Sequence, residues 1–230
     1  MINGSKTFIT NGYSADIVVT AVRTSPERKA KGITLFAIPT DAEGHGRGRK
    51  LDKVGQHESD TAERFFEGVR VTDDDIVGEL DNGFIHMMQN LPQERLGCAI
   101  SNLAHVKQIL GETIAYTIDR KAVGASIGSF QHNKFLLAGL VTQIEVTQAY
   151  VDQCVIAHTK KELTPVDAAK AKWWTSQVAE RSARPLRPAA RWLRLHERAP
   201  RRAWRDARVS KIWAGSNKIM KELIGRDLGL

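Results

Sequence analysis

Residues 100–114 read ISNLAHVKQILGETI, and this stretch decides the fold class. Its apolar side chains are spaced as on one face of a helix with 3.6 residues per turn. The same spacing returns further along the chain. The two faces consist of Ile100, Leu103, Leu110 and Ile114, and of Leu137, Leu140, Ile144, Val151 and Val155. We therefore expect long bundle helices from about residue 81 onward.

Outward from this stretch, the first 70 residues follow a different pattern. Short β-branched or aromatic runs at 7–10, 17–23, 33–38 and 64–66 are separated by Asn11-Gly12, Ser25-Pro26 and the glycines 44, 46 and 48. This pattern predicts an antiparallel β unit. Residues 1–4 resemble the middle of a hairpin without its partner strand, so we expect the true start of the protein to be missing.

Turn residues also divide the helical part of the chain. Breaks are predicted at 124–128 and at Thr164-Pro165, where Thr164 can cap the helix that begins at Pro165. The last helix should start near Ser216 and run to Ile224. The expected fold class is α+β, with a partial antiparallel β domain at 1–78 and a C-terminal helical, four-helix-bundle domain at 79–230.

Composition bounds the function classes. The chain is 42% hydrophobic and 26% charged, as in soluble globular proteins. Neither an apolar run of about 18 residues nor a signal-peptide layout occurs, so we expect no membrane span and a cytoplasmic setting. Cys98 and Cys154 have no second ligand at metal spacing and are interpreted as core residues. The seven histidines show no metal spacing either, so no metal site is predicted.

The net charge of +8 comes almost entirely from residues 181–202. That segment holds eight arginines and one acid, Glu197, together with three of the seven prolines. A basic nucleic-acid binder would use this charge and would show steep salt dependence. We disfavour that function because no aromatic stacking pattern or reading helix accompanies the arginines.

Four segments in order along the chain resemble the acyl-CoA dehydrogenase family. They are INGSKTFITNG (2–12), FEGVRVTDDDIVGELDNGF (66–84), DRKAVG (119–124) with SFQ (129–131), and ARVSKIWAGSNKIMKELIGRDL (207–228). The resemblance implies a flavoprotein of fatty acid β-oxidation and lipid metabolism. Such an enzyme removes the α proton of an acyl-CoA thioester while a hydride leaves the β carbon for N5 of FAD. It further implies an electron-transfer flavoprotein as partner and a homotetramer.

The catalytic base is the most informative position. Most of the family carries Glu directly before the Gly-Thr or Gly-Ser of the last segment, and this chain has Ala214. A subgroup that includes long-chain and isovaleryl-CoA dehydrogenases has a small residue there and a Glu in a Glu-Arg-Leu context earlier, as in residues 94–96. The resemblance therefore implies Glu94 as base, with Arg95 beside the substrate pocket. Alternatively, Glu94 is a solvated first-turn acid after Pro92, and Arg95 a surface cation.

Two residues resemble the pair that reaches the FAD pyrophosphate and adenosine from a neighbouring subunit. They are Arg120 and Gln131, within elements where Val123 replaces the usual Phe. The planar guanidinium suits phosphate oxygens because it can bond two of them. The alternative for Arg120 is an ordinary cation at the C-terminus of a helix.

The remaining cofactor residues come from both ends of the chain. Phe8 and Thr10 match a family strand that lies against the flavin, although Thr in a strand is also a common packing residue. Ser216 and Asn217 match an element where a helix N-terminus offers amides to the cofactor, and either would also serve as a plain N-cap.

Residues 181–202 replace a family segment that contains Gln-Leu-His-Gly-Gly-Tyr-Gly-Tyr-Met. Codons that can encode residues 186–197 read Cys-Val-Gln-Leu-His-Gly-Gly-Tyr-Gly-Tyr-Met when shifted by one base, which indicates two compensating frame changes, either sequencing errors or real lesions. With the family's N-terminal helical domain also expected to be missing, we predict an inactive or impaired fragment. The rival hypothesis is a non-catalytic helical-bundle protein that associates with intact family subunits.

Overall fold

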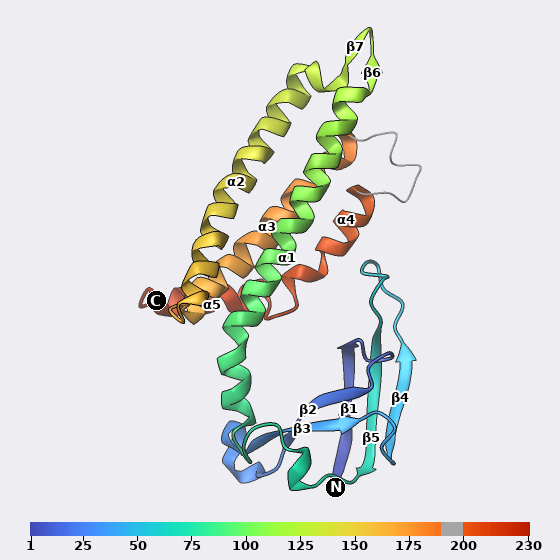
Figure 1. Ribbon diagram of the computed structural model, residues 1–230, viewed down its shortest axis with the longest axis vertical. Coiled ribbons are helices and arrows are strands. Elements are labelled where there is room, and N and C mark those ends of the chain that lie inside the picture. The colour runs from blue at the N-terminus through green and yellow to red at the C-terminus, as the bar shows by residue number, and fades with distance from the viewer. Residues whose placement is uncertain (190–199) are drawn as a thin grey trace. The chain divides into compact units, whose positions relative to one another are not determined.

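The computed structural model describes residues 1–189 and 200–230, with side chains described outside 183–201. The chain forms two compact units, residues 1–90 and 91–230, which we treat separately. Figure 1 shows strands in the first unit and helices in the second. The predicted α+β class is confirmed.

The first unit contains two antiparallel sheets. One has the order β1-β5-β4, formed by Ile2–Thr10, Thr61–Val69 and His45–Lys50. The other pairs β2 (Ile17–Arg23) with β3 (Ile33–Pro39). Short 3-10 helices lie at Pro26–Gly32 (η1) and Asp73–Asp75 (η2). The buried core of this unit consists of Ile2, Phe36, Ile38, Phe66 and Val69.

Strand β4 corrects the sequence analysis, which treated glycines 44, 46 and 48 as separators between strands. The strand runs through Gly46 and Gly48 and pairs with β5. A Cβ built on Gly48 would lie 2.6 Å from the Phe65 ring and 2.8 Å from the Glu63 Cβ. Glycine is thus needed here because the two strands approach closely, a reason that local turn preference does not reveal.

The second unit is helical, and its first helix begins within the first unit's range. The helices are α1 (Gly83–Asp119), α2 (Gln131–Thr159), α3 (Pro165–Ala189), α4 (Pro200–Ala207) and α5 (Asn217–Asp227). A small hairpin of β6 (Lys121–Ala122) and β7 (Ala125–Ser126) is followed by η3 (Ile127–Ser129), and η5 (Val209–Lys211) lies between α4 and α5. Leu103, Leu110, Leu140, Ile144 and Val151 lie in the buried core.

Local signals place the helix ends correctly. The Thr164 hydroxyl accepts a hydrogen bond from the Asp167 amide at 3.1 Å, and α3 begins at Pro165 as predicted. Ser216 caps α5, which runs three residues past the predicted Ile224 and carries an ion pair between Arg226 and Glu222. The predicted break at 124–128 is the β6–β7 hairpin.

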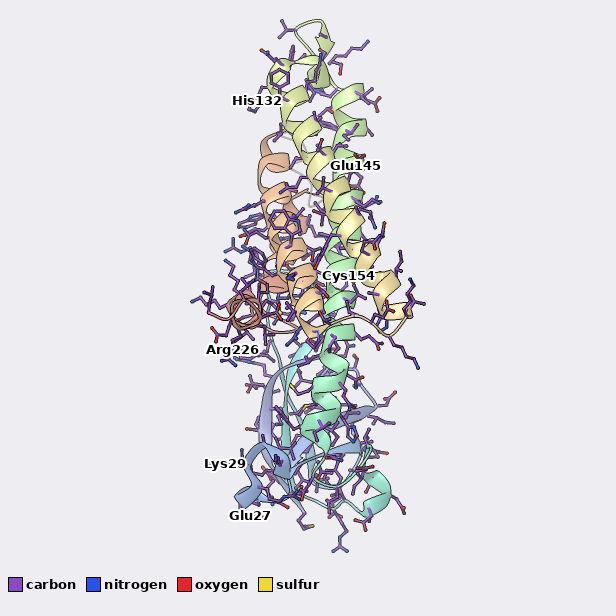
Figure 2. The ribbon with its side chains drawn as sticks, turned by 90° about the vertical axis from the view of Figure 1, so that its left-hand side faces the viewer. Glu27, Lys29, His132, Glu145, Cys154 and Arg226 are labelled. Atoms are coloured by element: carbon purple, nitrogen blue, oxygen red, sulfur yellow. The ribbon has the colours of Figure 1, made fainter. Side chains whose placement is uncertain are left out.

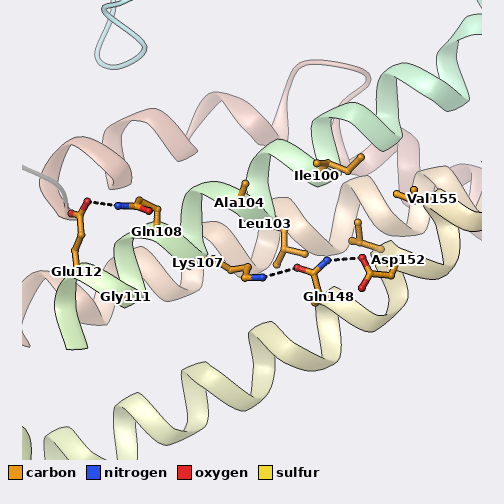
Figure 3. A pocket seen from close by; sticks show the side chains of 11 residues that line it. Ile100, Leu103, Ala104, Lys107, Gln108, Gly111, Glu112, Gln148, Asp152 and Val155 are labelled. Carbon is orange, nitrogen blue, oxygen red and sulfur yellow. Dashed lines mark hydrogen bonds between the residues drawn. The ribbon is translucent and has the colours of Figure 1, made fainter. Parts of the chain in front are cut away.

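Some residues of the predicted apolar faces, and Cys98, are not fully buried. Ile100 and Val155 are 44% and 37% exposed, and they line a groove of about 590 Å³ between α1 and α2 (Figure 3). Cys98 is half-buried beside the loop before α5, whereas Cys154 is buried as predicted. The helical period predicts which face of a helix is apolar. How much of that face a neighbouring helix covers depends on tertiary packing. None of the helices described is both long and apolar enough to cross a membrane.

Candidate functional site

The turn that precedes α5 has an unusual backbone. Ala214 and Gly215 both have left-handed φ angles, 51° and 95°. Glycine suits the second position chiefly because of its φ angle, and a Cβ there would also lie 2.7 Å from Cε at the flexible end of Met220. Alanine in a left-handed conformation, as at position 214, costs about 1–2 kcal/mol. Since Met220 is completely buried under the turn, neighbouring groups hold the turn in place.

Arg95 of α1 contacts this turn directly. Its side chain is only 7% exposed, and its Nε donates a hydrogen bond to the Ala214 carbonyl at 3.3 Å. Burial lowers the pKa of the Arg95 guanidinium, and the neighbouring Glu94 carboxylate acts in the opposite direction. Arg95 thus links α1 to the Ala214 turn, whereas the side chain of the neighbouring Glu94 is exposed, so its pairing with Ala214 stays a prediction.

Lys172 of α3 holds the same turn from another side, and the sequence analysis missed it. Its side chain is completely buried, and its Nζ donates to the Gly215 carbonyl at 2.6 Å and to the Asn217 Oδ1 at 3.1 Å. A lysine beside Ala168, Ala169 and Ala171, all 0% exposed, was the available signal. An ionisable residue within a buried alanine-rich segment is rarely incidental.

The side chains of Ser216 and Asn217 are both engaged within the chain. The Ser216 hydroxyl accepts from the Ile219 amide at 3.4 Å, which is the N-cap contact. The Asn217 amide group also exchanges hydrogen bonds with the Ser176 hydroxyl, at 2.9 and 3.1 Å. Asn217 thus faces α3, and its side chain shapes the turn.

Cys98 and Trp213 close the side of the turn that faces α1. The Trp213 indole Nε1 donates to the Cys98 Sγ at 3.1 Å. Burial raises the pKa of the Cys98 thiol, although the Trp213 contact opposes the shift. The thiol therefore acts as a neutral packing and hydrogen-bonding group at physiological pH.

Arg120 and Gln131 lie at the opposite end of the helical unit. Both are exposed, on either side of the β6–β7 hairpin that joins α1 to α2. Figure 2 shows His132, next to Gln131, at the end of α2 remote from Arg226 of α5. At 1.5 Å of rise per residue, Glu94 lies about 38 Å along α1 from the β6–β7 hairpin. The structure therefore does not bring the two ends together within one chain.

Phe8 and Thr10 belong to the first unit. Phe8 has a left-handed φ of 61° at an irregularity of β1, and its ring is 76% exposed. Positive φ is a genuine outlier for a bulky residue, and such outliers cluster at functional sites. Thr10, opposite Thr61 of β5, is exposed as well.

The α1–α2 groove contains none of the site residues predicted from the sequence. Figure 3 shows Lys107, Gln148 and Asp152 joined across it. The Lys107 Nζ donates to the Gln148 Oε1 at 3.1 Å, and the Gln148 Nε2 donates to the Asp152 Oδ1 at 2.6 Å. These groups bond one another, and the surface of the groove mixes polar and apolar side chains.

Groups with the chemistry that a flavin dinucleotide needs occur at separate places among the described residues. Such a cofactor presents an aromatic ring system and a charged pyrophosphate, and the chain offers exposed groups for both. Phe8 presents apolar ring surface, and Arg120 presents a guanidinium suited to phosphate. The first turn of α5 adds backbone amides at a helix N-terminus.

Two family models match the sequence. The model for the middle domain of acyl-CoA dehydrogenase matches residues 1–69, and the model for the C-terminal domain matches residues 81–229. The long-chain specific acyl-CoA dehydrogenase, mitochondrial, of Sus scrofa is 40% identical over 231 residues, which is 99% of this chain and 54% of that protein.

Solved structures agree with these matches. The acyl-CoA dehydrogenase from Geobacillus kaustophilus aligns with a TM-score of 0.95 and 37% identity, over 99% of this chain and 61% of that one. A chain of the structure described as the electron transferring flavoprotein of Acidaminococcus fermentans aligns with a TM-score of 0.93 and 30% identity, over 98% and 60%. The chain thus spans about half to three-fifths of the length of these proteins.

Proposed function

Because the chain belongs to the acyl-CoA dehydrogenase family, we propose that it supplies part of an enzyme that oxidises an acyl-CoA thioester between its α and β carbons. The observation that carries this proposal is the hydrogen bond from Arg95 to the Ala214 carbonyl. It joins the helix that carries Glu94 to the turn where most of the family has its base. We assign the missing carboxylate to Glu94, the residue that precedes Arg95 in α1.

In the proposed reaction, Glu94 acts as the general base. One of its carboxylate oxygens takes the proton from the α carbon, a role that contributes about 10²–10⁴-fold to the rate in enzymes generally. Arg95 positions the turn through Ala214 and keeps a positive charge beside the carboxylate. When bound, FAD would supply the acceptor for the hydride from the β carbon.

The cofactor residues are assigned by the same proposal. Phe8 and Thr10 would lie against the flavin, with Ser216 and Asn217 offering backbone amides at the start of α5. Arg120 and Gln131 would reach the cofactor of a neighbouring subunit, since about 38 Å of helix separates them from Glu94 in their own chain. This assignment requires a homo-oligomer, which we propose to be a tetramer.

Several finer features remain part of the proposal. Electron-transfer flavoprotein would be the electron acceptor. We retain domain limits at 1–78 and 79–230, and a cytoplasmic setting, although the porcine relative carries the word mitochondrial in its name. Cell fractionation would distinguish the two locations. Most of residues 181–202, the segment that differs from the family pattern, lies outside the residues whose side chains are described.

The 230-residue chain by itself should be an impaired enzyme. It spans 54% of the porcine relative, and an incomplete pocket would admit water to the reacting atoms. The competing function is a non-catalytic bundle that associates with intact subunits of the same family. That protein would bind no flavin.

The absorbance spectrum between 350 and 500 nm distinguishes these two functions. The purified chain is desalted after incubation with FAD, and a sample without FAD serves as the control. A retained flavin band supports the enzyme proposal. A folded, colourless protein that still associates with intact family subunits would favour the non-catalytic function.

A further inference from the structure

Lys172 is a buried charge to which the proposed reaction assigns no role. It lies in α3 with an exposed fraction of 0%. Removing an ammonium group from water is costly unless other groups replace its hydration. The contacts of Lys172 therefore indicate its role in the structure.

Both acceptors of the Lys172 ammonium lie in one turn. Nζ donates to the Gly215 carbonyl at 2.6 Å and to the Asn217 Oδ1 at 3.1 Å. Within residues 1–182 and 202–230, no carboxylate is bonded to it. Its charge is thus directed at neutral oxygens on either side of Ser216, the N-cap of α5.

A second buried cation holds the preceding carbonyl. Arg95 donates to Ala214 from α1, while Lys172 donates to Gly215 from α3. The two positive charges repel one another, and the charge of Arg95 adds to the effect of burial in lowering the pKa of Lys172. Both cations instead bond carbonyls of the two adjacent residues with left-handed φ angles, Ala214 and Gly215.

Each of these carbonyl contacts restrains the backbone where it departs from ordinary geometry. Ala214 in particular adopts a φ of 51° that alanine rarely takes. Such a conformation persists only where the surroundings fix it. Two donors on separate helices fix both carbonyls and thereby set the direction in which α5 presents its first amides.

We propose that Lys172 is a positioning residue that, together with Arg95, clamps the Ala214–Gly215 turn so that the first turn of α5 is ordered for the cofactor. The clamp itself is a property of this chain, and its consequence for the cofactor rests on the proposed function above. Lys172 does not touch the reacting atoms in this scheme.

Hydrogen–deuterium exchange of the full chain tests the clamp without any cofactor. In Lys172→Met, amides of residues 213–220 should exchange about tenfold faster than in the wild type, because the turn loses the donor to two oxygens. Amides of residues 100–114 should be unchanged. Lys170→Met is the matched control, since Lys170 lies on the same helix with its side chain 43% exposed and pairs only weakly with Asp167 at 3.6 Å.

A second pair of variants keeps the test decisive if Lys172→Met loosens the whole helical unit. Asn217→Ala removes one acceptor from the opposite side of the contact and should accelerate exchange in 213–220 alone. Lys172→Arg retains a charged donor and should restore part of the protection that Lys172→Met loses. Unchanged exchange of residues 213–220 in both Lys172→Met and Asn217→Ala would overturn the clamp.

FAD titration, followed by quenching of flavin fluorescence, tests the consequence separately. Lys172→Met should weaken FAD binding about tenfold, with Lys170→Met equal to the wild type. If the wild type does not bind FAD while the exchange result holds, the proposed function fails and the clamp stands. Normal FAD binding by Lys172→Met would overturn the role of Lys172 toward the cofactor.

Discussion

The two ends of the helical unit are built in opposite ways. At the turn before α5, the polar groups are buried and satisfied by one another: Arg95 bonds Ala214, and Lys172 bonds Gly215 and Asn217. At the β6–β7 hairpin, by contrast, Arg120 and Gln131 are exposed, and Val123 is 97% exposed. The first end is thus formed by buried groups, whereas the side chains of Arg120 and Gln131 at the second end are exposed to solvent.

Under the proposed function, the two ends would serve as two kinds of functional surface. A buried network fixes geometry, which a reacting centre needs, since misplaced groups lose catalytic efficiency. An exposed cation at a hairpin suits a ligand held mainly by another subunit. Changes at the turn should therefore alter chemistry and stability, and changes at the hairpin should alter cofactor retention.

The largest effect is expected for Glu94→Gln, which removes the proposed base and leaves the shape of the side chain. In flavin-loaded protein, the rate of acyl-CoA oxidation should fall about 10²–10⁴-fold. Glu112→Gln, also on α1 but remote from the turn, is the matched control and should leave the rate unchanged. Stopped-flow absorbance with short and long saturated acyl-CoA thioesters provides the measurement. Equal rates for Glu94→Gln and wild type would show that the turn is not the reacting end.

Next is Met220→Ala, which removes the completely buried side chain beneath the turn. The cavity should lower the free energy of unfolding by about 2–5 kcal/mol. Its neighbour Ile219 is 52% exposed, so Ile219→Ala should have a much smaller effect in the same urea titration. Equal losses for the two variants would mean that the turn is no better packed than the surface of α5.

The hairpin end is addressed by Arg120→Ala, which removes the proposed phosphate donor. A charge-assisted hydrogen bond is worth about 1.5–3 kcal/mol, so FAD affinity should fall about 10–100-fold. Because Arg120 would act on the neighbouring subunit, co-assembly with Glu94→Gln chains at limiting FAD should restore acyl-CoA oxidation at sites that combine Glu94 of one chain with Arg120 of the other. The absence of any restoration would indicate that Arg120 serves its own chain or none.

The smallest effect concerns Val123, a β-branched residue with a left-handed φ of 52°. Val123→Gly should stabilise the protein by about 1 kcal/mol, because glycine adopts this conformation without strain. Val123→Ala keeps a Cβ and should gain much less. Thermal unfolding of both variants is the check, and a destabilised Val123→Gly would mean that the exposed valine has packing partners in the assembled protein.

Sequence patterns predicted the elements more reliably than the contacts between them. The strand signals at 17–23 and 33–38 and the Thr164 cap were correct because they depend on neighbouring residues. Strand β4 was missed because its glycines serve close approach to β5, and Ile100 was misplaced because burial depends on a neighbouring element. Lys172 was missed for the same reason, since its acceptors lie more than forty residues away.

The pairing of Glu94 with Ala214 was implied by the family resemblance and stays a prediction, while the contact that the structure shows at this turn is that of Arg95 with Ala214. That pairing, and the chemistry assigned to it, is the central claim. Addition of a saturated acyl-CoA to the flavin-loaded chain, followed at the flavin absorbance band, tests it most directly. We predict bleaching in the wild type and a retained, unbleached band in Glu94→Gln. Equally fast bleaching of both proteins, or none in a flavin-loaded wild type, would contradict the claim.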